Sequence, residues 1–185
     1  MPILGPEPTI FPPDLLQSSD GLSGHWWVLP TLPRQEKELA RRLLKQRVGF
    51  YSPTILRTQR SPAGRLRTTH TLLFPSYVFL HGDETARLAA LSTRCVANCL
   101  EVVRQEHFLR ELRQVRQVIE AGVDLTPEGQ LSPGDPVRIK SGPMQGIIGV
   151  VIERRGQKRL LVEVNFIQQG ASMEIQDLDL EPYTP

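Results

Sequence analysis

The stretch VRIKSGPMQGIIGVV, residues 137–151, indicates two short strands of alternating apolar residues joined by a turn. Glycine and proline recur at fixed offsets through it, at Gly142, Pro143, Gly146 and Gly149. A glycine inside a strand weakens that strand unless the backbone bulges or another segment approaches closely. The combination therefore predicts a tight turn in a closely packed β structure, and it identifies a fold without naming a partner.

More strand-like runs surround this turn. Short apolar runs bounded by glycine, proline or polar turns occur at 136–140, 146–153, 160–166, 171–176 and 178–182. Five short antiparallel strands in so few residues must close on themselves to hide their edges. We therefore predict a small all-β five-stranded barrel over 134–185.

The preceding part of the chain mixes helices and strands. HWWVL at 25–29 and CLEVVR at 99–104 indicate strands, and 53–80 indicates a hairpin with a basic arm that turns at RSPAGR. Helical spacing occurs over 34–48 and 105–122, and Asp83 is a favourable N-cap for another helix. The order predicts an α+β domain, an antiparallel sheet flanked by helices, over 24–121.

Composition sets the remaining boundaries. Residues 1–23 contain five prolines and neither Lys nor Arg, so we expect a disordered N-terminal tail. Glycine, proline and serine interrupt every pattern near 122–133, which we expect to be a flexible linker. Residues 24–120 contain 16 basic and eight acidic side chains, whereas 121–185 contains six and nine. This uneven distribution suggests that the first domain meets a polyanion.

The sequence favours no catalytic or metal chemistry. Cys95 and Cys99 have no histidine pair at ligand spacing, so we expect buried or half-buried free thiols. No phosphate-binding loop or nucleophile motif occurs. We expect a cytoplasmic monomer with no metal, cofactor, enzymatic activity or membrane span.

The glycine pattern of 137–151 resembles the KOW motif. HWWVL followed by a helix, then LLFPSYVFL, then LSTRCV and the barrel, resembles the layout of NusG-family transcription factors over 26–182. The resemblance implies an NGN domain whose aromatic surface packs on the clamp helices of the largest RNA polymerase subunit. FPSYVF matches that family segment, which implies polymerase contacts at Phe74, Tyr77 and Phe79. Strand alternation requires some of these rings to be core.

The resemblance extends to a specialised paralogue group that includes RfaH, UpxY and LoaP. In that group the NGN domain also contacts the non-template DNA strand. By resemblance, STRCV places Thr93 and Arg94 at DNA-facing positions, and helix residues Arg41, Arg42 and Lys45 lie near others. A solvated helix surface explains the helix arginines equally well, and few aromatics lie among them to stack on bases.

In this family the KOW domain contacts a second factor. NFIQQGASMEI lies where those contacts cluster, so Phe166, Ile167 and Met173 are candidates for partner binding, with barrel core as the equal alternative. The resemblance implies an elongation or antitermination factor that suppresses pausing. Two alternatives stay open: a general NusG that couples to Rho or to a small-subunit ribosomal protein, and a KOW-containing RNA-binding or ribosome-associated protein. The net negative charge of the second domain disfavours an RNA-binding or ribosome-associated protein.

Overall fold

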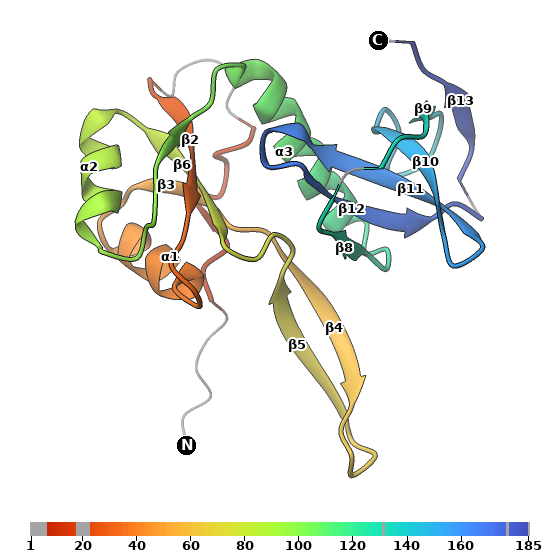
Figure 1. The fold of residues 1–185 in the computed structure, drawn as a ribbon, viewed down its shortest axis with the longest axis horizontal. Coiled ribbons are helices and arrows are strands. Elements are labelled where there is room, and N and C mark those ends of the chain that lie inside the picture. The colour runs from red at the N-terminus through yellow and green to blue at the C-terminus, as the bar shows by residue number, and fades with distance from the viewer. Residues whose placement is uncertain (1–6, 18–22, 131, 177, 185) are drawn as a thin grey trace. The chain divides into compact units, whose positions relative to one another are not determined.

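The computed structural model describes residues 7–17, 23–130, 132–176 and 178–184 (Figure 1). Contacts divide the chain into two compact units, Met1–Gln105 and Glu106–Pro185. The sequence places the end of the first domain at 121, so the structural division falls earlier. The difference concerns one helix, Gln105–Glu120, which the sequence assigns to the first domain and which belongs to the second unit from Glu106 onward.

The first unit is built on an antiparallel sheet. Its described strands follow the order β1-β3-β6-β2-β7. Strand β2 pairs with β6 along its whole length, from His25 opposite Gly82 to Pro30 opposite Tyr77. The bounds are β1 Ile10–Phe11, β2 His25–Pro30, β3 Gly49–Tyr51, β6 Tyr77–Gly82 and β7 Leu100–Glu101.

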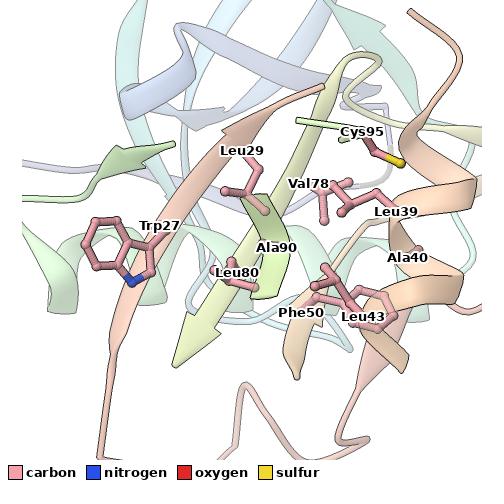
Figure 2. Close-up of a cluster of buried hydrophobic side chains, with 10 residues drawn as sticks. All are labelled: Trp27, Leu29, Leu39, Ala40, Leu43, Phe50, Val78, Leu80, Ala90 and Cys95. Carbon is pink, nitrogen blue, oxygen red and sulfur yellow. The ribbon is translucent and has the colours of Figure 1, made fainter. Parts of the chain in front are cut away.

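Two helices contribute to the core of this unit. Helix α1 spans Glu36–Lys45 and helix α2 spans Glu84–Ser92. The N-cap predicted for α2 is confirmed, because Asp83 Oδ1 accepts a hydrogen bond from Ala86 N at 2.9 Å. Figure 2 shows the buried cluster that joins helices and sheet, formed by Trp27, Leu29, Leu39, Ala40, Leu43, Phe50, Val78, Leu80, Ala90 and Cys95. Each large aliphatic side chain stabilises the fold by about 1.5–3 kcal/mol on burial.

The expectation of a disordered tail over 1–23 is wrong for residues 7–17. Strand β1 pairs with β3, with Ile10 opposite Tyr51, and Ser52 N donates to Thr9 O at 2.7 Å. Leu15 and Leu16 are buried. These tertiary contacts offset the ordering entropy, although the local sequence shows no regular pattern. Residues 1–6 and 18–22 of the expected tail lie outside the described residues.

The predicted basic hairpin is confirmed. Strands β4, Thr54–Arg60, and β5, Leu66–Leu72, pair only with each other among the described strands. Ser61 N donates to Arg65 O at 2.8 Å across the turn, in which Gly64 has φ +75°. In Figure 1 this two-stranded ribbon extends away from the sheet of its own unit.

The second unit contains all of helix α3, Gln105–Glu120, except its first residue, and a sheet of six described strands in the order β13-β9-β10-β11-β12-β8. The predicted five-stranded closed barrel is therefore corrected: there is one more strand, and no pairing joins β13 to β8 in the described residues. Strand β8 lies inside the expected linker 122–133. The bounds are β8 Thr126–Glu128, β9 Asp135–Ile139, β10 Ile148–Arg154, β11 Gln157–Val164, β12 Gln169–Glu174 and β13 Leu180–Pro182, with a 3-10 turn, η1, at Asn165–Ile167.

Candidate functional site

The glycine-rich turn joins β9 to β10. Gly142 and Gly146 have φ of +86° and +87°, values that favour glycine over any residue with a Cβ. Gly146 N donates to Ile139 O at 2.9 Å, and Ile139 N donates to Ile147 O at the same distance. These bonds close the turn, with Pro143 exposed at its tip. Gly142 and Gly146 therefore shape the turn, as the sequence pattern predicts.

Gly149 has a different reason to be glycine. It lies inside β10, and a Cβ built there would come within 2.5 Å of Leu161 O on the neighbouring strand β11. The sequence leaves a bulge or a close backbone approach as the reason for this glycine, and the structure shows the close approach.

Two of the three aromatic residues assigned to a polymerase surface are core residues. Phe74 is 1% exposed and Phe79 is fully buried, with ring centroids 6.0 Å apart. Phe79 also lies 6.5 Å from the Tyr51 ring. The expectation that Phe74 and Phe79 contact polymerase is therefore corrected, since they are the rings that belong to the core. In β6 the side chains at 78, 79 and 80 are all buried, because both faces of this central strand are covered.

Tyr77 remains partly exposed at the start of β6. It lies directly opposite Pro30, the last residue of β2, so the two side chains share one face. Pro75 is exposed just before it, and Leu32, just beyond β2, is 43% exposed. Thr31 N donates to Ser76 O at 2.9 Å, which holds the two chain segments together. This end of the sheet, called here the Tyr77 edge, carries Pro30, Leu32, Pro75 and Tyr77.

Helix α1 presents its predicted DNA-facing side chains to solvent, and two of them are ion-paired. Arg41 lies 3.3 Å from both Glu7 and Glu38, and Arg42 Nε donates to Glu38 at 2.7 Å. Hydrogen bonding to Arg42 lowers the pKa of Glu38. Lys45 is exposed. Partial neutralisation by Glu38 reduces the charge that this helix offers to a polyanion.

Thr93 is not available for contact. It is 4% exposed, its hydroxyl donates to Ala90 O at 2.6 Å, and the same oxygen accepts from Cys95 N at 3.2 Å. Thr93 therefore ends helix α2, and its assignment as a DNA-binding side chain is corrected. Arg94 is exposed, with φ +59°.

The three partner-binding candidates of the second unit also divide into buried and exposed residues. Ile167 and Met173 are 8% and 1% exposed, so both are core and their assignment is corrected. Phe166 is 38% exposed, and its ring packs edge-on against Phe108 of α3 at 6.0 Å.

Helix α3 contributes polar contacts that sequence reasoning missed. Glu111 accepts from Asn165, Gln114 Oε1 accepts from Ile148 N at 2.7 Å, and Gln117 Nε2 donates to Pro143 O at 3.1 Å. These three residues lie three positions apart on one helical face. The three-residue spacing of these polar side chains is the sequence signal that could have predicted the contacts. The apolar residues of α3 account for a helix without it.

The cysteines agree with the sequence expectation of free thiols. Cys95 is buried and Cys99 is half-buried, and burial raises the pKa of the Cys99 thiol. Within the described ranges no cluster of three potential metal ligands occurs. No described helix is both long and apolar enough to span a membrane.

The first part of the chain is similar to a known protein family. The family model described as "Transcription termination factor nusG" matches residues 24–127, more than half of the chain. A solved chain described as "Crystal Structure of MjSpt4:Spt5 complex conformation B" is similar at 16% identity and a TM-score of 0.29, over 86% of this chain and 99% of that one. A comparison with curated proteins gives no match. On the strength of the family model, the chain belongs to the NusG family of transcription factors.

Proposed function

We propose that this chain is a specialised NusG-type elongation and antitermination factor that binds RNA polymerase and suppresses pausing. Its first unit serves as the NGN domain and bridges the polymerase cleft at the clamp helices of the largest subunit. No covalent step is needed, because a protein that binds the closed clamp better than the open one shifts the equilibrium toward the closed state.

The observation that carries this proposal is the partly exposed Tyr77 opposite Pro30, with Leu32 and Pro75 exposed beside them. A rigid aromatic side chain with apolar neighbours is the kind of anchor that dominates protein interfaces. Phe74 and Phe79 of the same segment are buried and pack against each other, so they are not available as anchors. The polymerase contact is thus assigned to the Tyr77 edge in place of the whole aromatic segment.

Contact with the non-template strand is assigned to the exposed basic side chains Lys45 and Arg94. Arg41 joins them once it is released from Glu7 and Glu38, and Arg42 once it is released from Glu38 and the carbonyl of Thr93. Ion pairs at this level of exposure contribute little free energy, so a phosphate can replace the carboxylate. Docking to polymerase raises the local concentration of DNA and compensates for a weak intrinsic affinity.

The second unit is assigned as a KOW-type module that recruits another factor, with Rho or a small-subunit ribosomal protein as candidates. The closed β9–β10 turn and the tight packing at Gly149 support this assignment. Phe166 is the accessible candidate among the three residues first considered.

A purified elongation assay tests the proposal. At saturating factor, the wild-type chain is expected to shorten pause lifetimes, and Tyr77→Ala is expected to lose this effect with little change in melting temperature. Leu88→Ala on α2, where Leu88 is 56% exposed, is the matched control for loss of a surface apolar side chain. Unchanged pause lifetimes with the wild-type chain would defeat the proposal.

A further inference from the structure

The β4–β5 hairpin concentrates positive charge without compensation. Its strands and turn, residues 54–72, contain four arginines and neither Asp nor Glu. In the described part of the chain, none of their guanidinium groups forms an ion pair or a hydrogen bond, unlike Arg41 and Arg42 of α1. The four arginines are Arg57, Arg60, Arg65 and Arg67.

The two faces of this ribbon differ. Residues opposite each other in an antiparallel pair share a face, and residues along a strand alternate between faces. Arg57 lies opposite Thr69, and Gln59 lies opposite Arg67, so these four polar side chains form one face. The other face carries Leu56 and Leu66, which are 63% and 67% exposed. The polar face therefore holds hydrogen-bond donors on both strands, whereas the opposite face mixes the two leucines with their partners His70 and Arg60.

The shape of the hairpin selects one class of nucleic acid. The strands of seven residues extend about 20 Å, and a two-stranded ribbon enters the roughly 12 Å major groove of B-form DNA. The deep, narrow major groove of A-form RNA does not admit such a ribbon. Residues 54–72 contain no Phe, Trp or Tyr to stack on unpaired bases, which disfavours a single strand.

We propose that the β4–β5 hairpin binds duplex DNA by placing its polar face in the major groove. Arg57, Gln59 and Arg67 face the base edges, where arginine pairs with guanine and glutamine with adenine. Arg60 and Arg65, at the loop end, contact flanking phosphates. This site is separate from α1 and from the Tyr77 edge, and it requires a different form of DNA.

The test measures binding of the full chain to a labelled DNA duplex of about two helical turns, by fluorescence anisotropy at about 50 mM salt and over a salt series. The double variant Arg57→Gln/Arg67→Gln is expected to bind about tenfold or more weakly. Its salt dependence is expected to flatten, because fewer counterions are released. Since polymerase is absent from this assay, its result does not depend on the proposed function.

A matched control removes the same charge from another hairpin. Arg155 and Lys158 are exposed at the β10–β11 connection of the second unit, so Arg155→Gln/Lys158→Gln changes net charge equally. The control variant is expected to keep duplex binding. If both double variants lose the same amount of duplex affinity, net charge alone explains the loss and the proposal is overturned. Wild-type protein that does not bind the duplex would also overturn it.

Two further measurements complete the design. Tighter binding to an RNA duplex or a single DNA strand of the same length would overturn the assignment to duplex DNA. If Arg57→Gln/Arg67→Gln no longer melts cooperatively, Arg60→Gln/Arg65→Gln tests the same hairpin at its loop end. That variant is expected to weaken duplex binding and reduce its salt dependence, and unaltered binding would contradict the proposal.

Discussion

The carboxylate of Glu111 on α3 accepts two hydrogen bonds from Asn165, at 3.2 Å from its backbone N and 2.6 Å from its Nδ2. Glu111 is 4% exposed and also lies 3.1 Å from His107 Nε2. Asn165 begins the 3-10 turn between β11 and β12, where Phe166 packs against Phe108. Helix α3 thus fixes the segment that the family resemblance associates with partner binding, and helix and sheet form one folding unit.

Loss of the Glu111 carboxylate is expected to destabilise the second unit. Glu111→Ala leaves two donors of Asn165 without their acceptor, which costs about 1–3 kcal/mol. Thermal unfolding of the full chain, followed by circular dichroism, measures the effect. Glu153→Ala, which removes an exposed carboxylate from β10, is the control. Equal melting temperatures for Glu111→Ala and wild type would contradict a structural role for this contact.

Glu163 makes the stability of this unit depend on pH. Burial, and then the charge of Glu111, raise the pKa of Glu163 above its ordinary value of 4.5. The folded protein therefore binds this proton more readily than the unfolded chain does. The resulting contribution to stability is fully present below pH 4.5 and is lost as the pH rises through the folded-state pKa.

Glu163→Gln is accordingly expected to raise the melting temperature near pH 7, because the variant does not carry the partly buried charge. The difference from wild type is expected to shrink as the pH falls toward 4.5. Melting curves of both proteins over that pH range measure it, with Glu153→Gln as the exposed control. A gain that grows toward acid would have the wrong sign and would exclude this explanation.

Local patterns were sufficient to predict the helices, the longer strands and the glycine turn. Alternation in 137–151, the N-cap at Asp83 and the positive-φ glycines Gly142 and Gly146 each depend on neighbouring residues alone. Such features are determined by short-range sterics and hydrogen bonding, which a sequence displays directly. The basic hairpin was predictable for the same reason.

Tertiary pairing was not visible in those patterns. Strand β1 is short and lies among prolines, and only its pairing with β3 explains its order. Phe79 is buried because other parts of the fold cover the second face of β6. The alternation of residues along a strand does not show whether that second face is covered. For the same reason, the sequence could not distinguish the accessible Tyr77 from the buried rings beside it.

Gly149 is expected to tolerate no side chain. A Cβ at this position would come within 2.5 Å of Leu161 O, and backbone of β11 cannot move aside without disturbing its pairing with β10. We expect Gly149→Ala to destabilise the second unit by about 1–3 kcal/mol. Gly129→Ala is the control, because a Cβ there meets no atom within 4 Å. Chemical denaturation of both variants measures the difference, and equal midpoints would exclude the close approach as the cause.

The burial of Phe79 and the exposure of Tyr77 predict opposite experimental signatures. Phe79→Ala removes a fully buried ring that packs against Phe74 and Tyr51, and is expected to cost about 3–5 kcal/mol of folding stability. Tyr77→Ala removes a partly exposed ring and is expected to cost much less. Denaturation midpoints measured beside polymerase affinity separate the two: Tyr77→Ala should weaken binding at nearly normal stability, whereas Phe79→Ala should lower stability first. If Phe79→Ala weakened binding while its midpoint stayed at the wild-type value, the polymerase surface would have to be reassigned from the Tyr77 edge to the buried ring.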